Sequence, residues 1–339
     1  MPDLSRRHLL AASSAAAAAT ALPAGAQAPA PGPGAFKGKS FLITGTSSGF
    51  GRLGALHYAR LGARVFATMR GLPRPEADEL RKIAKDEKLD IHVVELDVRS
   101  DEQVAAAVAE AERINGGMVD VLINNAGVVI GGPVEVHDME ATKLAFDTNV
   151  FGPHRLARAV LPPMRARKSG LIVNVSSQQG RVVMPASGLY TSTKFALEAL
   201  SEQMAYELVP HGIEVVIIEP GGFGTKVGVN RARYMAEVAG RAADKHTSGY
   251  PEMVARMTAP LPADAATSAD KTLPGKPDPM DVPRAIAEIV AMPAGSRPLR
   301  RPVHPGNKPQ LAINRVSAES QLALLGGGPY ADWARAVLD

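Results

Sequence analysis

The fold of this chain is decided by residues 40–51, Ser40-Phe41-Leu42-Ile43-Thr44-Gly45-Thr46-Ser47-Ser48-Gly49-Phe50-Gly51. Residues 40–44 predict a β-strand and residues 52–61 a helix. Small residues between the two elements let the backbone approach an anion such as a pyrophosphate, whose charge the helix N-terminus stabilises. A simple tight turn without a ligand is the alternative interpretation.

The sequence beyond this stretch alternates between short apolar runs and helical runs, the pattern of a parallel sheet with crossover helices. Strands are expected at residues 40–44, 64–68, 91–96, 119–124, 171–175 and 215–219, and a seventh, edge strand at 299–303. Helices are expected at residues 52–61, 101–114, 140–168, 189–208 and 282–292. We therefore predict an α/β fold, a doubly wound (Rossmann) mostly parallel seven-stranded sheet with helices on both faces, in a single domain.

Residues 1–28 have the features of an export signal. Arg6-Arg7 precede a short Ala-rich apolar run that ends in Ala26-Gln27-Ala28, and paired arginines of this kind resemble a twin-arginine signal. We expect a periplasmic or secreted protein. A retained membrane anchor, or a disordered segment on a cytoplasmic protein, is the alternative. Residues 29–36 predict a linker and residues 37–339 the folded domain.

The composition argues against several classes of protein. The net charge of +4 comes from 38 basic and 34 acidic residues that are interspersed, which does not indicate nucleic-acid binding. The chain has no cysteine, so disulfides, thiolate zinc sites and a cysteine nucleophile are excluded. Its eight histidines lack metal-ligand spacing. We expect no metal and no stable membrane insertion.

Residues 227–279 interrupt the alternation of strands and helices, and they are rich in Ala, Met, Pro and Gly. This segment leaves the carboxyl end of a predicted strand, which is where ligands bind in open α/β sheets. We interpret it as a helical or loop-like substrate lid. A solvated insertion with no role is the alternative.

Tyr190 and Lys194 are the most informative pair of side chains. They lie four residues apart on a predicted helix, so they share one helix face. A neighbouring ammonium lowers the pKa of a phenol, which is about 10 when unperturbed. Such a tyrosine can exchange a proton with a carbonyl or alcohol oxygen near neutral pH. Chance neighbours on a solvated helix face are the alternative.

The end of the second predicted strand bears on the choice of nucleotide. An acidic residue there would hold the ribose 2′-hydroxyl of NAD, but the sequence has Arg70. Arginine favours a 2′-phosphate through charge-assisted contacts, and Ser48 could add a hydroxyl donor, so NADP is favoured over NAD. Arg70 facing only water is the alternative. Asp97, after the third strand, is placed to contact the adenine amino group, unless it is only a helix N-terminal residue.

Together these motifs resemble the short-chain dehydrogenase/reductase superfamily. They are Thr-Gly-x-x-x-Gly-x-Gly at 44–51, Asn-Asn-Ala-Gly at 124–127, Asn149, Ser177, Tyr190-x-x-x-Lys194 and Pro220-Gly221, and the resemblance spans residues 37–303. It implies that Ser177 hydrogen-bonds the substrate oxygen and that Tyr190 is the acid/base. It also implies that Lys194 tunes Tyr190 and holds the nicotinamide ribose, while Asn149 binds a water that links Lys194 to solvent.

The resemblance implies a cofactor-binding set as well: Gly45, Ser47, Ser48, Gly49, Phe50, Gly51, Arg70, Asp97, Val98, Asn125, Ala126, Gly127, Tyr190, Lys194, Pro220, Gly221, Phe223 and Thr225. The implied activity is hydride transfer between a nicotinamide and a small-molecule carbonyl or secondary alcohol. Residues 66–70 look like those of NADP-linked steroid and retinoid dehydrogenases, which does not fix the substrate. A homodimer or homotetramer through the helices at 140–168 and 189–208 is also implied. An NADP-binding sensor or scaffold without turnover, and an NAD-preferring alcohol dehydrogenase, are the alternatives.

Overall fold

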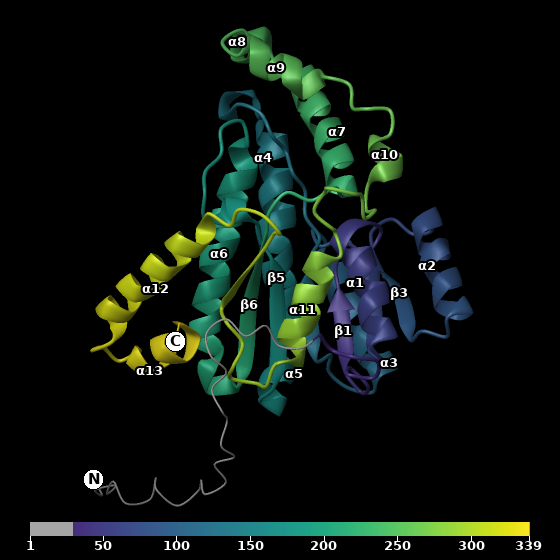
Figure 1. The fold of residues 1–339 in the computed structure, drawn as a ribbon, viewed down its shortest axis with the longest axis vertical. Helices are drawn as coiled ribbons and strands as arrows, with labels where there is room; N and C mark the ends of the chain where they lie inside the picture. Colours follow the sequence, from purple (N-terminus) through teal and green to yellow (C-terminus); the bar gives the residue numbers. More distant parts are fainter. Residues whose placement is uncertain (1–29, 339) are drawn as a thin grey trace, which may run out of the picture.

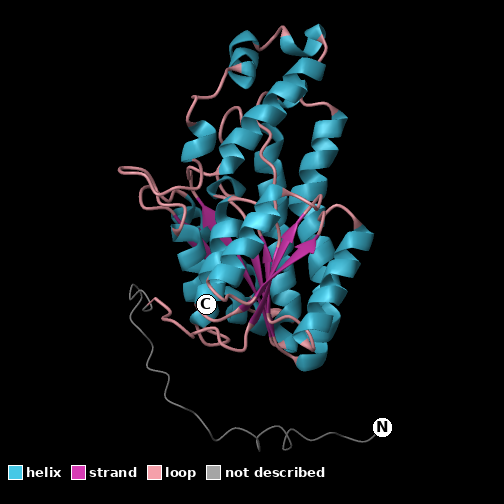
Figure 2. Cartoon of the chain, turned by 90° about the vertical axis from the view of Figure 1, so that its right-hand side faces the viewer, coloured by secondary structure: helices cyan, strands magenta, loops and turns pink. Residues whose placement is uncertain are grey.

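The computed structural model describes residues 30–338 and has a seven-stranded sheet at its centre (Figure 2). Every neighbouring pair of strands is parallel, in the order β3-β2-β1-β4-β5-β6-β7. The strands are β1 (Ser40–Ile43), β2 (Arg64–Met69), β3 (Ile91–Glu95), β4 (Val121–Asn124), β5 (Gly170–Val175), β6 (Ile213–Pro220) and β7 (Arg300–Val303). The prediction of a doubly wound sheet with β7 at its edge is confirmed.

The strand order reverses between β1 and β4, because β1 pairs with β2 on one side and with β4 on the other. The chain winds outward in both directions from this point. Such a reversal opens a crevice at the carboxyl ends of the strands. The turn at residues 44–51 follows the carboxyl end of β1, so it lies at the edge of this crevice.

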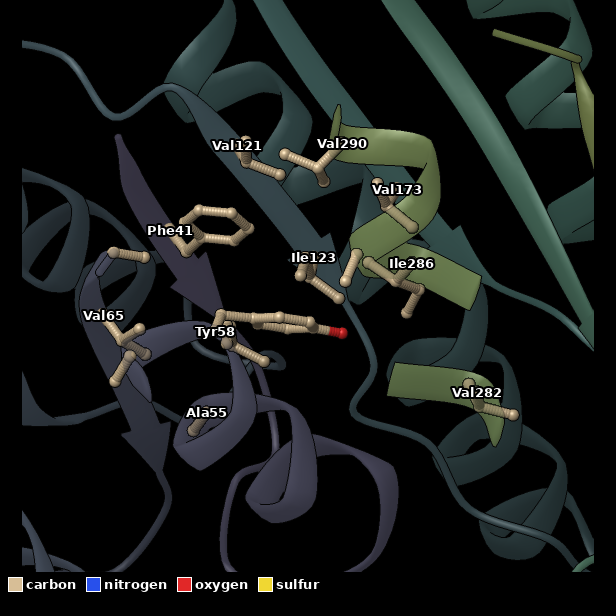
Figure 3. Packing of buried hydrophobic residues seen from close by; sticks show 14 of the residues in the cluster. Phe41, Ala55, Tyr58, Val65, Val121, Ile123, Val173, Val282, Ile286 and Val290 are labelled. Carbon is tan, nitrogen blue, oxygen red and sulfur yellow. The ribbon is translucent and has the colours of Figure 1, made fainter. Parts of the chain in front are cut away.

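Helices cover both faces of the sheet, as predicted. On one face lie α1 (Gly49–Arg60), α2 (Pro75–Asp86) and α11 (Asp281–Ala291), and Figure 3 shows Tyr58 of α1 beside Phe41 of β1, with Ile286 and Val290 of α11 near Ile123. The Phe41 and Tyr58 rings stack at 5.2 Å between centroids. On the other face lie α3 (Asp101–Asn115), α5 (Gly152–Arg167), α6 (Gly188–Leu208) and α13 (Ala331–Leu338). Burial on both faces explains why the strands read as continuous apolar runs.

The predicted linker ends one residue too late. Phe36 is fully buried, its ring lies 5.3 Å from that of Phe41, and its amide donates to the carbonyl of Leu61 at 2.9 Å. An apolar side chain that closes one end of the core belongs to the domain, so the folded unit includes Phe36. The predicted export signal at residues 1–28 lies outside the described residues.

The helix predicted at residues 140–168 is present as a continuous helical run over residues 139–167, but a π-helical segment divides it. The structure has α4 (Met139–Phe146), a π-helical segment η2 (Asp147–Phe151) and then α5. Pro153 has no amide hydrogen to donate to the carbonyl one turn earlier, so the hydrogen-bond ladder must change there. The interruption also turns the Asn149 amide toward Val128 and Thr193, to which it hydrogen-bonds.

The segment predicted as a lid is mostly helical. It forms α7 (Lys226–Arg241), α8 (Asp244–Thr247), α9 (Pro251–Thr258) and α10 (Ala265–Ser268), and Figure 1 shows α7 rising past the top of the sheet, with α8 and α9 at its far end. Its apolar residues Tyr234, Met235, Val238 and Met257 pack against the residues that follow β4 and against α4. This apolar packing makes the segment part of the folded domain.

Two further parts of the structure were not predicted. Helix α2 follows β2, and α12 (Gln310–Leu325) precedes α13 at the end of the chain, extending away from the sheet (Figure 1). The short turns η1 (Val134–Val136), η3 (Gln178–Gly180) and η4 (Val209–His211) complete the elements. Within residues 30–338, none of the helices has the length and apolar character needed to cross a bilayer.

Candidate active site

A cleft of about 420 Å³ opens at the carboxyl ends of the central strands. It lies where the strand order reverses, and the α7 residues Val227, Asn230 and Arg233 form part of its wall. Most of the sequence-predicted site residues line it, namely Gly45, Ser47, Ser48, Gly49, Phe50, Arg70, Asp97, Val98, Asn125, Ala126, Gly127, Ser177, Tyr190, Lys194, Pro220, Gly221, Phe223 and Thr225. The other two, Gly51 and Asn149, lie behind its wall. The structure therefore gathers side chains that are far apart in the sequence around one cavity.

The turn between β1 and α1 has no room for larger side chains. A Cβ at Gly51 would overlap the carbonyl oxygen of Gly45 and lie 2.5 Å from Asn125 Nδ2. Gly45 has a φ of 72° and would place a Cβ 2.9 Å from the Ala126 Cα atom. Asn125 Nδ2 donates to the carbonyls of Thr44 and Gly45 at 2.9 and 3.1 Å, which fixes the turn to the end of β4. This bare backbone at a helix N-terminus fits the pyrophosphate of a dinucleotide.

The segment predicted as a lid is tied to this turn by Asp270, a residue that the sequence analysis did not identify. Its carboxylate accepts hydrogen bonds from the amide of Gly49 at 2.9 Å and from the amide of Lys226 at 3.0 Å. Its own amide donates to the carbonyl of Gly224 at 2.8 Å. One side chain thus supplies acceptors to the first turns of both α1 and α7. No local motif marks this aspartate, because its partners lie far away in the sequence.

Basic side chains gather at the end of the cleft next to β2. Arg70, Arg74 and Arg233 line it, and Arg70 Nη2 donates to the Tyr234 hydroxyl of the lid at 3.4 Å. In the described part of the chain, Arg70 has no carboxylate within ion-pair distance. Asp97 also lines the cleft, but Arg99 pairs with it at 2.6 Å, and the hydrogen bond from Arg99 holds the pKa of the Asp97 carboxyl below its usual range. This end of the cleft therefore favours an anionic group.

Ser177, Tyr190 and Lys194 meet on the other side of the cleft. Lys194 is buried, its Nζ donates to the Val175 carbonyl at 2.9 Å, and it lies 5.8 Å from the centre of the Tyr190 ring. Burial raises the pKa of Tyr190, and a hydrogen bond with Ser177 opposes this shift. Burial also lowers the pKa of Lys194 to about 8, although the charge of Glu198 acts in the opposite direction. A proton-donating phenol thus lies next to a cation that can lose its charge near pH 8.

Two of the expected roles differ in detail from what the structure contains. The lowering of the Tyr190 pKa expected from Lys194 is absent, because burial dominates and the ammonium is bonded to the backbone instead. Asn149 Nδ2 donates to the Val128 carbonyl at 2.8 Å and to Thr193 Oγ1 at 3.0 Å, while its Oδ1 accepts from the Val128 amide at 2.8 Å. Asn149 therefore joins the residues after β4 to α6, and its expected contact with a water remains a prediction.

Comparison with known proteins agrees with this geometry. The family model for "short chain dehydrogenase" matches residues 39–235, which is more than half of the chain. The chain belongs to the short-chain dehydrogenase family. It is 41% identical over 192 residues to an uncharacterized oxidoreductase, YusZ, of Bacillus subtilis, covering 56% of this chain and 66% of that protein. It is also 32% identical over 289 residues to retinol dehydrogenase 8 of Bos taurus, covering 84% and 87% of the two chains.

Solved structures give the same result for the fold. A short-chain dehydrogenase from Streptomyces avermitilis superimposes with a TM-score of 0.61 at 31% identity, covering 84% of this chain and 95% of that one. Solved structures of this fold carry NADP in some cases and NAD in others. The protein is therefore an oxidoreductase of a family that uses nicotinamide cofactors and acts on small molecules.

Proposed function

We propose that this protein is an NADP(H)-dependent oxidoreductase that moves a hydride between the nicotinamide and the carbon of a carbonyl or secondary alcohol, with Tyr190 as acid/base. The observation that carries this proposal is that Ser177, Tyr190 and the buried Lys194 line the same cleft as the turn at residues 44–51. The cofactor supplies the hydride when bound, and the protein supplies orientation and a proton.

In carbonyl reduction, the Tyr190 hydroxyl donates its proton to the substrate oxygen as negative charge develops there. Its raised pKa keeps the phenol protonated at neutral pH, which suits a donor. Ser177 can give a second hydrogen bond to the same oxygen. The Lys194 ammonium can then return a proton to the phenolate that remains on Tyr190. Alcohol oxidation uses the same groups in the reverse direction.

The test is a panel of carbonyl compounds with NADPH, and of alcohols with NADP, followed by the change in NADPH absorbance. Steroid-like, retinoid-like and short-chain compounds should all be included, because neither the lid nor the cleft selects one substrate. The proposal requires turnover with at least one member of the panel. Tight NADPH binding without any turnover would instead support a nucleotide-binding sensor or scaffold.

Arg70→Ala is expected to weaken NADPH binding by a factor of about 10–100, because a charge-assisted contact contributes about 1.5–3 kcal/mol. NADH affinity should change little, since NADH has no 2′-phosphate for Arg70 to contact. Equilibrium titration of the protein fluorescence with both nucleotides measures this. Arg81→Ala on α2, which removes an exposed arginine paired only with Asp78, is the charge control. An unchanged preference in Arg70→Ala would show that this residue does not select the cofactor.

The rate of carbonyl reduction should fall at alkaline pH as Lys194 loses its proton. The folded-state pKa of this ammonium is about 8, so the cation is present below pH 8 and disappears above it. We expect kcat/KM to decline by up to about tenfold per pH unit beyond that point, as for one essential ionisation. Lys194→Arg keeps its charge over this range and should lose this alkaline limb. The same decline in Lys194→Arg would assign the ionisation to another group.

A further inference from the structure

Helix α7 presents three residues of one face to the cleft. Val227, Asn230 and Arg233 follow one another at intervals of three and all line it, so they lie along the same side of the helix. The helix begins at Lys226, after β6, and rises away from the sheet (Figure 1). At a rise of 1.5 Å per residue, Arg233 lies roughly 10 Å beyond that start. α7 therefore brings a side chain from well above the strand ends into the wall of the cleft.

Tyr234, the next residue of α7, connects this helix with the end of β2. Its side chain is 7% exposed and packs in the apolar cluster that α7 forms with α4 and the residues after β4. Its hydroxyl accepts the hydrogen bond from Arg70 Nη2 at 3.4 Å. The contact places α7 at the basic end of the cleft, where Arg70 follows β2.

Two guanidinium groups from different elements flank the Tyr234 side chain. Arg233 Cζ lies 4.3 Å from the centre of the Tyr234 ring, and Arg70 lies at its hydroxyl. Burial alone would raise the pKa of Tyr234, but the hydrogen bonds and charges of Arg70 and Arg233 hold it below its usual value. The tyrosine is thus surrounded by positive charge that comes from both β2 and α7.

The donors of this cluster are available to a ligand. Arg233 pairs with Glu237 on the same helix, but the two side chains are 52% and 44% exposed, and exposed pairs of this kind contribute little to stability. Arg233 can therefore exchange this partner at small cost. Because the Tyr234 oxygen accepts the bond from Arg70, its O–H is still able to donate.

We propose that α7 supplies the second half of the site for the 2′-phosphate of NADP, with Arg233 and the Tyr234 hydroxyl binding this phosphate opposite Arg70. The inference rests on the proposed function, in which NADP(H) is the cofactor. A phosphate accepts several charge-assisted hydrogen bonds, and a planar guanidinium matches two of its oxygens at once. Arg233 and Tyr234 are then determinants of cofactor choice in addition to Arg70.

The position of the cluster favours the 2′-phosphate over the pyrophosphate. The pyrophosphate fits the bare turn between β1 and α1, whereas Arg70 follows β2, the next strand outward in the sheet. An arginine after this strand lies at the adenosine ribose of a dinucleotide. Since Tyr234 contacts Arg70 directly, the donors of α7 lie at the same point.

This site couples cofactor choice to the rest of the cleft. Val227 and Arg233 belong to one helix and both line the cleft, so a phosphate that binds Arg233 also fixes the wall formed by Val227. Coupling between two bound ligands is reciprocal. NADPH should therefore hold α7 in place, and lower the substrate KM, more than NADH does.

The test is the affinity of Arg233→Ala for NADPH and for NADH, measured by isothermal titration calorimetry. We expect NADPH affinity to fall by about tenfold, as for the loss of one charge-assisted contact, and NADH affinity to stay unchanged. Arg233→Lys keeps the charge but not the planar fork, so it should recover part of the loss. Tyr234→Phe keeps the buried ring and should weaken NADPH binding alone, by about threefold.

Arg256→Ala on α9 is the matched control, because Arg256 is 78% exposed and pairs with Glu252 at 3.8 Å. It removes the same charge from the same segment and should leave both affinities unchanged. Adenosine 2′-phosphate is a probe of the site itself, and Arg233→Ala should weaken its binding but not that of adenosine 5′-phosphate. Hydrogen exchange of residues 226–241 gives a readout of α7, which NADPH should protect more than NADH in the wild type but not in Arg233→Ala.

Three results would overturn the inference. They are wild-type NADPH affinity in Arg233→Ala, an equal loss of NADPH and NADH affinity, and the same loss in Arg256→Ala as in Arg233→Ala. A wild-type protein that prefers NADH, or that shows no turnover, would instead refute the proposed function. Loss of the NADPH preference in Arg70→Ala but not in Arg233→Ala would refute only the part assigned to α7.

Discussion

Tyr190→Phe is expected to reduce kcat for carbonyl reduction by a factor of about 10²–10⁴, the usual contribution of a positioned general acid. The substitution removes only the hydroxyl, so the ring and its packing beside Lys194 remain. Affinity for NADPH should therefore stay close to that of the wild type. Stopped-flow measurement of hydride transfer, with a separate titration of NADPH binding, distinguishes a loss of chemistry from a loss of binding.

Tyr330→Phe is the matched control for this experiment, because Tyr330 is exposed and its ring packs against Trp333, away from the cleft. Its kcat should equal that of the wild type. Retained turnover in Tyr190→Phe would refute the acid/base role of this residue. A loss of NADPH binding equal to the loss of kcat would show that Tyr190 acts mainly by holding the cofactor.

Gly51→Ala is the second substitution with a large expected effect. The added methyl group would overlap the carbonyl oxygen of Gly45 and meet the Asn125 amide at 2.5 Å, and the first of these is backbone that can move only with the whole turn. We expect the free energy of unfolding to fall by about 1–3 kcal/mol, as for other overpacked sites. NADPH binding should weaken by about tenfold or more, because the displaced turn no longer presents its amides to the pyrophosphate.

Gly240→Ala on α7 provides the control, since a Cβ there would meet no atom within 4 Å. Alanine in an open helical position should be neutral or stabilising by up to about 1 kcal/mol. Thermal unfolding and NADPH titration of both variants give the comparison. Equal behaviour of the two alanine variants would show that close backbone approach at residue 51 is unimportant.

The strand positions were predictable from sequence because their signals are local. A buried parallel strand reads as an apolar run bounded by turn residues, and each of the seven strands has such a run or, for β7, flanking prolines that indicate an edge. The predictions differed from the structure where the local sequence pattern was weak or pointed to another kind of element. Phe36 follows a Pro- and Gly-rich stretch that resembles a linker, and the long apolar pattern at residues 140–168 conceals the π-helical segment at Asn149.

The sequence by itself determined the class of protein, because the family motifs are short stretches whose spacing encodes a turn, a strand end or one helix face. Only the tertiary structure showed that Asp270 ties the first turn of α7 to the turn at residues 44–51, and that α7 contributes Arg233 to the cleft. These contacts join residues that are remote along the chain, and their energies depend on burial and distance. The spacing of residues along the chain does not encode burial or distance, so these contacts became visible only in the folded structure.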